Sequence, residues 1–239
     1  LHSDIPLEID FEQLSVKEPD GPALLLILRE LEFTSLLKYV TQAPAKEAEY
    51  RTVLSDADFR GMLEVLSHAT ELSFDTETTS LDPMQAELVG VSFSFEPYAA
   101  YYLPLGHTYA GAPSQLPREK VLGRLKNLLE DPFLKKIGQN LKYDMQVLRH
   151  AGIEVRGILF DTMIASYLLN PSKTSHGLDA IALEYLNYKT MTYSDVTGTG
   201  KKQIGFNEVD IVMATRYSGE DAVRRRTVSN PYCAWISSS

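Results

Sequence analysis

The chain has 239 residues, of which 44% are hydrophobic and 23% are charged, a composition that is typical of globular proteins and excludes wholesale disorder. Its 32 acidic residues outnumber its 23 basic residues, so the formal net charge is −9. This charge excludes a protein that binds nucleic acid over a broad surface by neutralising phosphates, and any nucleic-acid function must depend on a local site or on a basic partner.

Residues 1–49 are predicted to form a linker with one or two short amphipathic helices, because Pro and Gly in KEPDGPA interrupt the apolar pattern. We expect the compact domain to span 50–228. Its first helix is predicted to begin after Ser55, an N-cap residue that precedes Phe59 at helical spacing. The last residues, 229–239, continue no apolar pattern, and we expect them to form a disordered tail.

Strands and helices are predicted to follow one another through the domain. Three strands come first, at 72–77, 87–95 and 99–105, and their short links favour an antiparallel meander. Two more strands are predicted at 135–140 and 157–161, helices at 117–132, 140–152, 161–171, 177–187 and 207–226, and a loop at 188–206. This order predicts an α/β fold, in which helices flank a mixed sheet.

The first of these strands ends in two acids one residue apart, within LSFDTETTSLDP. Residues i and i+2 of a strand share a face, so Asp75 and Glu77 point one way while Phe74 and Thr76 point the other way. Two carboxylates so placed repel each other unless cations neutralise them, and Mg²⁺ or Mn²⁺ prefers oxygen ligands. Taken alone, Asp75 and Glu77 fit a solvated pair of acids on an edge strand as well as they fit a metal site.

Two more polar pairs lie four residues apart in predicted helices, so each pair shares one helix face. Asn140 and Asp144 begin the helix 140–152, where Asn140 taken alone is most simply an N-cap. Tyr217 and Asp221 lie in the last helix, where the alternative is an exposed acid beside a half-buried tyrosine. Together the three motifs offer four carboxylates, an amide and a phenol, a set that matches two-metal hydrolysis of a phosphodiester.

In this order and spacing, FDTET-SLD, GQNLKYD and Y-x3-D resemble the three motifs of the DEDD superfamily of 3′→5′ exonucleases, and the tyrosine of the third motif indicates the tyrosine subclass. Longer stretches, among them AELVGVSFSFEP and AGIEVRGILFDTMIASYLLNP, resemble the proofreading domain of bacterial DNA polymerase I. The resemblance covers about 52–222 and implies an RNase H-like (DnaQ-like) fold.

The resemblance also implies a catalytic role for five residues. Asp75, Glu77, Asp144 and Asp221 would hold two divalent metal ions, Mg²⁺ or Mn²⁺, while Tyr217 would orient the attacking water. Two metal ions in such a site activate the water and stabilise the leaving oxygen.

Three further residues match substrate-binding positions of the family. Leu81 falls where an apolar side chain wedges between the last two bases, and Asn140 matches the amide that steadies the terminal nucleotide. Thr76 falls where the chain approaches the terminal sugar, although strand alternation turns its side chain away from Asp75 and Glu77.

The implied activity is hydrolysis of the terminal phosphodiester at single-stranded or frayed DNA 3′ ends, with release of 5′-mononucleotides, as a proofreading module in replication and repair. The implied partners are polymerase and 5′-nuclease modules of a longer chain, with 1–49 as the tail after the 5′-nuclease module. Two alternatives remain open. One is a catalytically silent scaffold of the polymerase, and the other is an RNA-trimming exonuclease, because a metal site does not distinguish DNA from RNA.

The remaining features concern the redox environment of the protein, its association with membranes and one glycine-rich stretch. Cys233 is the single cysteine, which excludes an intrachain disulfide, and we expect a reducing, cytoplasmic environment. No apolar run approaches the roughly 20 residues of a membrane span, so we expect no association with membranes. We also expect a monomer. The glycine-rich DVTGTGKKQ is not a phosphate-binding loop, because Asp195 stands where that motif needs glycine.

Overall fold

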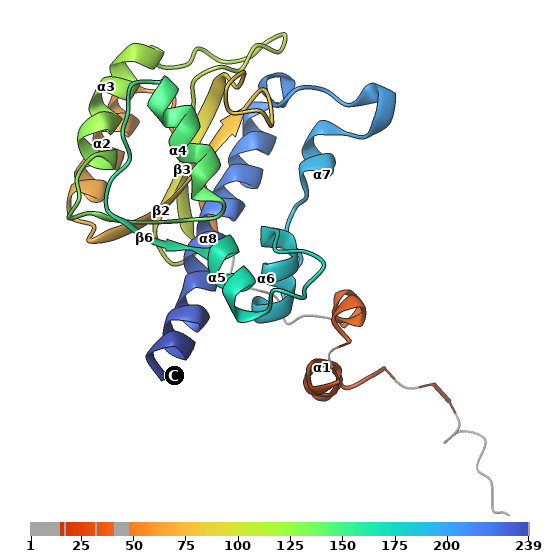
Figure 1. Ribbon diagram of the computed structural model, residues 1–239. Coiled ribbons are helices and arrows are strands. Elements are labelled where there is room, and N and C mark those ends of the chain that lie inside the picture. The colour runs from red at the N-terminus through yellow and green to blue at the C-terminus, as the bar shows by residue number, and fades with distance from the viewer. Residues whose placement is uncertain (1–14, 17, 32, 41–47, 239) are drawn as a thin grey trace, which may run out of the picture. The chain divides into compact units, whose positions relative to one another are not determined.

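The computed structural model describes residues 15–16, 18–31, 33–40 and 48–238, and the chain forms two compact units, residues 1–43 and 44–239 (Figure 1). In the first unit the described residues form helix α1 (Gly21–Glu30) and the short 3-10 helix η2 (Thr34–Tyr39). Both lie within the predicted linker. Within the described parts of the chain, no helix has the length and apolar character to cross a membrane.

The second unit is built on a six-stranded mixed sheet with the strand order β1-β4-β3-β2-β5-β6. Strands β2, β3 and β4 form an antiparallel meander, whereas β1, β5 and β6 pair in parallel with their neighbours. The strands are β1 (Glu49–Thr52), β2 (Glu71–Thr78), β3 (Leu88–Glu96), β4 (Ala99–Pro104), β5 (Lys135–Gly138) and β6 (Ile158–Asp161). The predicted α/β fold is confirmed, and β1 is an additional strand whose four residues are too few to show an alternating pattern.

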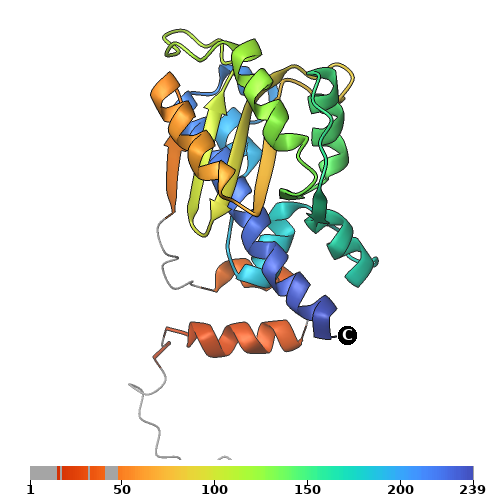
Figure 2. The same ribbon diagram turned by 90° about the vertical axis from the view of Figure 1, so that its left-hand side faces the viewer.

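Three helices cover one face of this sheet, and α2 and α3 lie in front of the strands in Figure 2. They are α2 (Asp56–Ser67), α3 (Arg118–Leu129) and α4 (Leu141–His150). Their apolar residues form one buried cluster with those of β2 and β3, including Leu125, Leu148, Phe74 and Phe93. Helix α2 begins as predicted, because the Ser55 hydroxyl accepts a hydrogen bond from the N–H of Asp58 at 3.1 Å.

The long helix α8 (Ile211–Ser238) covers the opposite face (Figures 1 and 2). Small residues allow its close approach to the strands. A Cβ on Gly219 would lie 2.7 Å from Cδ1 of Tyr50, and Ala222 packs against Ala100 of β4. The backbone of α8 is helical to Ser238, within the stretch 229–239 where the sequence predicts a disordered tail, and the predicted domain boundaries stay predictions.

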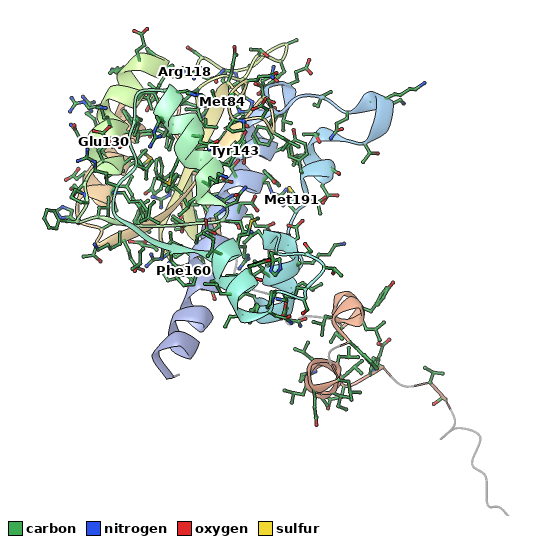
Figure 3. All side chains as sticks on the ribbon, in the orientation of Figure 1. Met84, Arg118, Glu130, Tyr143, Phe160 and Met191 are labelled. Carbon is green, nitrogen blue, oxygen red and sulfur yellow. The ribbon has the colours of Figure 1, made fainter. Side chains whose placement is uncertain are left out.

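Two helices after β6 and a set of short helices complete the unit. Helices α5 (Thr162–Leu169) and α6 (Leu178–Leu186) pack with Val228 of α8 and with Phe160, which Figure 3 labels. The segment 188–206, predicted as a loop, contains α7 (Tyr193–Thr197) and the 3-10 helix η3 (Gly200–Lys202), and η4 (Phe206–Glu208) starts at its end. These helices are too short to show a helical period, although Thr192 and Asp195 form a capping box at the start of α7.

Candidate active site

The site lies where strand β2 extends beyond its neighbour β5. β2 pairs with β5 only over Glu71–Ser73, but its pairing with β3 continues to Thr78. Beyond Ser73, side chains bind the backbone groups on this edge of β2. The carbonyl of Phe74 accepts from Nη1 of Arg225 at 3.2 Å, and the N–H of Thr76 donates to Oδ1 of Asp144 at 3.0 Å. The unequal strand lengths therefore open the sheet edge to polar side chains.

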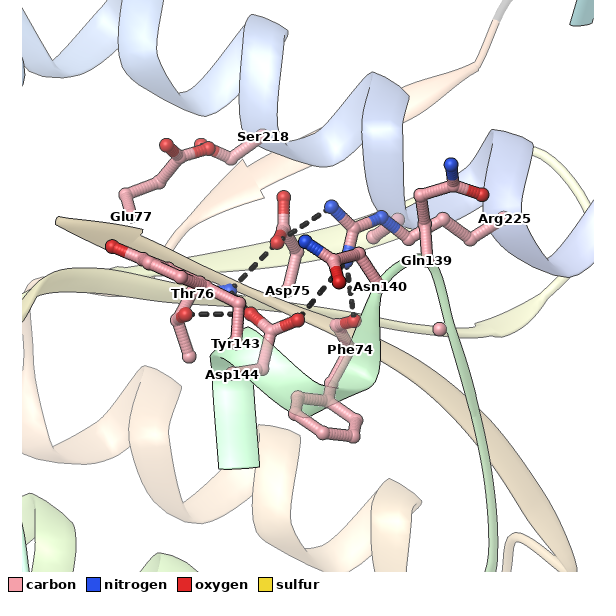
Figure 4. A network of polar contacts seen from close by, with 12 residues as sticks. Phe74, Asp75, Thr76, Glu77, Gln139, Asn140, Tyr143, Asp144, Ser218 and Arg225 are labelled. Carbon is pink, nitrogen blue, oxygen red and sulfur yellow. Dashed lines mark hydrogen bonds and ion pairs between the residues drawn. The ribbon is translucent and has the colours of Figure 1, made fainter. Parts of the chain in front are cut away.

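The two acids of β2 point toward α8, as the alternation of the strand predicts. Asp75 forms an ion pair with Nη2 of Arg225 at 2.6 Å, and Glu77 accepts a hydrogen bond from the Ser218 hydroxyl at 2.6 Å (Figure 4). Thr76 points to the other face, where its hydroxyl donates to Oδ1 of Asp144 at 2.6 Å. The side chain of Thr76 therefore turns away from Asp75 and Glu77, as strand alternation predicts, and contacts Asp144 of α4.

Asp144 joins the two faces of the sheet. It comes from α4, which covers the face opposite α8, and its Oδ2 lies 3.8 Å from Nη1 of Arg225. Its other oxygen accepts from both the backbone and the side chain of Thr76. Asp144 can reach Arg225 because β5 ends at Gly138 and leaves the edge of β2 open.

Asn140 does not cap α4 with its side chain. It adopts the left-handed conformation, with φ 55° and ψ 44°, which asparagine tolerates better than most residues. Asp161 accepts instead from the backbone N–H groups of Asn140 at 3.2 Å and Leu141 at 2.8 Å. The simple N-cap interpretation of Asn140 is therefore wrong, and its exposed amide is free of a capping hydrogen bond.

Helix α8 supplies the third motif. Tyr217 is half-buried, with its ring centroid 5.8 Å from that of Phe206 and 6.4 Å from that of Tyr193. Burial, followed by the charge of Asp221, raises the pKa of the Tyr217 phenol far above its ordinary value. The phenol is therefore protonated at neutral pH and able to donate a hydrogen bond.

All four acids of the motifs are buried, with 6% of Asp75, 6% of Glu77, 2% of Asp144 and 7% of Asp221 exposed. Burial is the main reason why the pKa of each of them is raised, and it raises the pKa of Asp144 to about 7. The charge of Asp75 is the next cause for the other three, whereas the Arg225 guanidinium lowers the pKa of all four.

The donor set fits hard divalent cations. Four buried carboxylates face the single guanidinium of Arg225, so the ionised cluster has an excess of negative charge and only oxygen ligands. Among the described residues, no three His, Cys, Asp or Glu side chains already converge on one ion position. Arg225 forms ion pairs with Asp75 and Asp144, and the Ser218 hydroxyl donates to Glu77.

The predicted substrate residues other than Thr76 are exposed. Leu81 is 96% exposed in the segment after β2, and Asn140 is exposed at the start of α4. The hydroxyl of Tyr143, which Figure 3 labels, donates to the carbonyl of Ser80 and is hydrogen-bonded to the Thr78 hydroxyl. Tyr143 thus anchors the segment that carries Leu81.

The sequence interpretation missed Arg225, Ser218 and Tyr143. Arg225 lies four residues after Asp221, so it shares that face of α8, and this spacing is a signal that could have identified it. It was hidden by its neighbours, Arg224 and Arg226, since a run of three arginines suggests a solvated helix face. No local signal marks Ser218 or Tyr143, because their partners come from distant segments.

Residues 50–226 match the family model described as 3′-5′ exonuclease. The chain is 41% identical over 237 residues to DNA polymerase I of Pseudomonas aeruginosa, in a match covering 93% of this chain and 26% of that protein. It is 42% identical over 168 residues to DNA polymerase I of Rhizobium leguminosarum, covering 63% of this chain and 16% of that protein. The chain thus spans about a quarter or less of the length of these relatives.

Solved structures share the fold. NrnC of Brucella melitensis has a TM-score of 0.55 at 24% identity, over 71% of this chain and 75% of that one. RNase D of Trypanosoma brucei, solved in complex with RNA U12, has a TM-score of 0.62 at 14% identity, over 83% and 64% of the two chains. The mixed sheet with its flanking helices is therefore the RNase H-like fold of exonucleases.

Proposed function

We propose, from the premise that the chain belongs to the 3′-5′ exonuclease family found in DNA polymerase I, that it hydrolyses the 3′-terminal phosphodiester of DNA and releases 5′-mononucleotides. The observation that carries the proposal is the cluster of four buried carboxylates at the end of β2. Buried acids with raised pKa values are unfavourable for folding, and they are common at functional sites.

The four acids are the proposed ligands for two divalent cations, Mg²⁺ or Mn²⁺. Asp75 and Glu77 present their carboxylates from β2, Asp144 presents its carboxylate from α4, and Asp221 does so from α8. When bound, such cations supply Lewis-acid polarisation of the phosphodiester and activation of water. Because the ligands come from rigid elements on both faces of the sheet, the fold restricts where the scissile phosphate binds.

Tyr217 is proposed to orient the attacking water. Its phenol remains protonated because burial and the charge of Asp221 raise its pKa, so it donates a hydrogen bond to the water oxygen. The rings of Phe206 and Tyr193 pack against it and restrict its orientation. Tyr217 therefore acts as a hydrogen-bond donor at neutral pH and not as a general base.

The exposed residues are proposed to bind the DNA end. Leu81 offers an apolar side chain that can wedge between the last two bases, and Asn140 offers an amide to the terminal nucleotide. Thr76 is buried, and its hydroxyl is bonded to Asp144, so we propose that its contact with the terminal sugar involves the backbone.

The preferred substrates are single-stranded or frayed 3′ ends. A paired end must be melted before its last nucleotide can reach the acids, and the net charge of −9 predicts weak DNA binding by this chain alone. The relatives are DNA polymerases I, of which this chain covers a small part, so we propose that it proofreads beside polymerase and 5′-nuclease modules.

The test is release of labelled 5′-mononucleotide from a 3′-labelled single-stranded DNA oligonucleotide in the presence of Mg²⁺ or Mn²⁺. Asp75→Asn is expected to slow release by about a hundredfold or more, since cation-based charge stabilisation contributes several kcal/mol. Glu71→Gln is the matched control, because Glu71 lies in the same strand and its carboxylate binds Arg226 outside the cluster. Release that Asp75→Asn leaves undiminished would contradict the proposal.

The same assay separates the two alternatives. A silent scaffold predicts no release with either ion. An RNA-trimming enzyme predicts faster release from an RNA oligonucleotide of the same sequence, since only the 2′-hydroxyl distinguishes the two substrates. The identity of 41% to a DNA polymerase I favours DNA.

A further inference from the structure

Arg225 occupies the centre of the acidic cluster. It lies one turn after Asp221 on α8 and is 7% exposed. Its Nη2 is 2.6 Å from Oδ1 of Asp75, and its Nη1 lies 3.8 Å from Oδ2 of Asp144 and 3.2 Å from the Phe74 carbonyl oxygen (Figure 4). The guanidinium thus bridges the first and second acidic motifs.

The guanidinium and a divalent cation compete for the same oxygens. A bound Mg²⁺ lies about 2.0–2.1 Å from its carboxylate oxygens, which is closer than the 2.6 Å between Nη2 of Arg225 and Oδ1 of Asp75. Two positive groups on one oxygen at such distances repel strongly where burial keeps water out.

The guanidinium is also incompletely satisfied in its present position. Its Nε is buried and makes no hydrogen bond with the described part of the chain. Displacement of the side chain therefore loses the two ion pairs and the Phe74 contact but no bond from Nε.

We propose that Arg225 is the internal counter-ion of this cluster, and that a divalent cation binds only by displacing its guanidinium from Asp75 and Asp144. This inference rests on the proposed function, because it assumes that the cluster takes divalent cations. Arg225 is a positioning residue in this account: it stabilises the cation-free chain and weakens the affinity of the chain for Mg²⁺ and Mn²⁺.

The first experiment measures Mn²⁺ affinity of the 239-residue chain by electron paramagnetic resonance, without substrate. Arg225→Met replaces the guanidinium with an unbranched apolar side chain and removes the charge. It is expected to tighten Mn²⁺ binding by at least about tenfold, because Asp75 and Asp144 lose the one cation that pairs with them among the described residues. Arg226→Met is the matched control, since Arg226 follows on the same helix and pairs with Glu71 outside the cluster; its affinity is expected within about twofold of the parent chain.

A second measurement is made on the parent chain itself and uses a substitution only to assign the resonance. The Arg225 Nε–Hε resonance, assigned by its absence from Arg225→Lys, is followed by NMR while Mg²⁺ is added to the parent chain. If Mg²⁺ displaces the guanidinium, the chemical shift of the Arg225 Nε–Hε resonance changes and its hydrogen exchange becomes faster. Both changes are expected to saturate at the same Mg²⁺ concentration as the binding that calorimetry measures. The Arg226 resonance is expected to stay unchanged.

The outcomes separate this inference from the proposed function. Mg²⁺ that saturates the chain while the Arg225 resonance stays unchanged overturns the inference and leaves the proposed function standing. Mn²⁺ affinity that Arg225→Met leaves equal or weakens also overturns it. Binding to Arg225→Met but not to the parent chain supports it, and binding to neither defeats both it and the proposed cation site.

Discussion

Lys136 is buried in strand β5, which pairs with β2, the strand that carries Asp75 and Glu77. It pairs with Leu72 in the β2–β5 register, and its Nζ donates to the carbonyl of Asp131. Burial lowers the pKa of its ammonium group from 10.5 to about 8. The unfolded chain therefore holds this proton more tightly than the folded chain, and proton binding opposes folding between these two pH values.

We predict that the stability of the chain relative to Lys136→Met rises as the pH increases from about 8 to about 10.5, by up to about 3 kcal/mol. The gain is complete above the unfolded pKa and is lost as the pH falls through the folded pKa. Urea unfolding of both chains across this range measures the difference. Lys135→Met is the control, since Lys135 is exposed in the same strand, and a flat difference for Lys136→Met would contradict the prediction.

The Asp161 carboxylate connects strand β6 to the starts of helices α4 and α5 by hydrogen bonds. It ends β6, and its Oδ1 accepts from the first N–H groups of α5, those of Met163 at 2.9 Å and Ile164 at 3.2 Å. The same carboxylate holds the N-terminus of α4 through Asn140 and Leu141. One side chain therefore fixes the starts of two helices, one of which carries Asp144.

We predict that Asp161→Ala lowers the free energy of unfolding by about 2–4 kcal/mol, roughly twice the effect of losing one helix cap. Ser55→Ala is the matched control, because Ser55 caps α2 alone, and it is expected to cost about 1 kcal/mol. Urea denaturation provides both values, and amide hydrogen exchange should quicken at Asn140 and Leu141. Equal costs for the two variants would show that Asp161 does not support both helices.

Gly90 of β3 pairs with Glu77 and lies directly against the side chain of Tyr102 in β4. A Cβ at this position would lie 2.3 Å from the hydroxyl oxygen of Tyr102. That ring cannot move easily, because it is fully buried and its hydroxyl is hydrogen-bonded to Nε2 of His107 at 2.7 Å.

We predict that Gly90→Ala destabilises the chain by about 1–3 kcal/mol through this overlap. Gly123→Ala is expected to do the opposite and stabilise by about 0.5–1 kcal/mol, since Gly123 is in helix α3 and nothing lies within 4 Å of its added Cβ. Thermal unfolding distinguishes the signs. A neutral Gly90→Ala would mean that Tyr102 can shift without cost.

When no cation is bound, the buried acids of the site lower the free energy of unfolding of the chain. Asp221 is 7% exposed, and burial and the charge of Asp75 raise its pKa well above the ordinary value. An ionised carboxylate in this position is unfavourable for folding, so the arrangement that suits cation binding weakens the cation-free fold.

We predict that Asp221→Asn raises the free energy of unfolding by about 1–2 kcal/mol in EDTA at neutral pH. Added Mg²⁺ is expected to raise the melting temperature of the parent chain, by mass action, and to have little effect on the variant. Glu71→Gln serves again as the control. A variant that is less stable than the parent in EDTA would contradict the prediction.

Local patterns in the sequence were sufficient for most of the architecture. The three strands β2, β3 and β4 and their antiparallel meander were predicted, the cap residue Ser55 marked the start of α2, and the last long helix appeared as a helical pattern. These features depend on residues a few positions apart. β1 and α7 were missed because four or five residues carry too little pattern.

The sequence by itself determined which residues share a face in two of the three motifs: Asp75 with Glu77 on β2, and Tyr217 with Asp221 on α8. Asn140 lies before the first residue of α4, so helical spacing does not set its direction. The proposed roles of these residues remain predictions. Only the tertiary structure decided that β5 stops short of the end of β2, so that Asp144 reaches Arg225 from the face opposite α8, and that Arg225 pairs with both Asp75 and Asp144. The physical reason is that side-chain direction follows from local backbone geometry, whereas burial and charge pairing depend on segments distant in the chain that meet only in the folded protein.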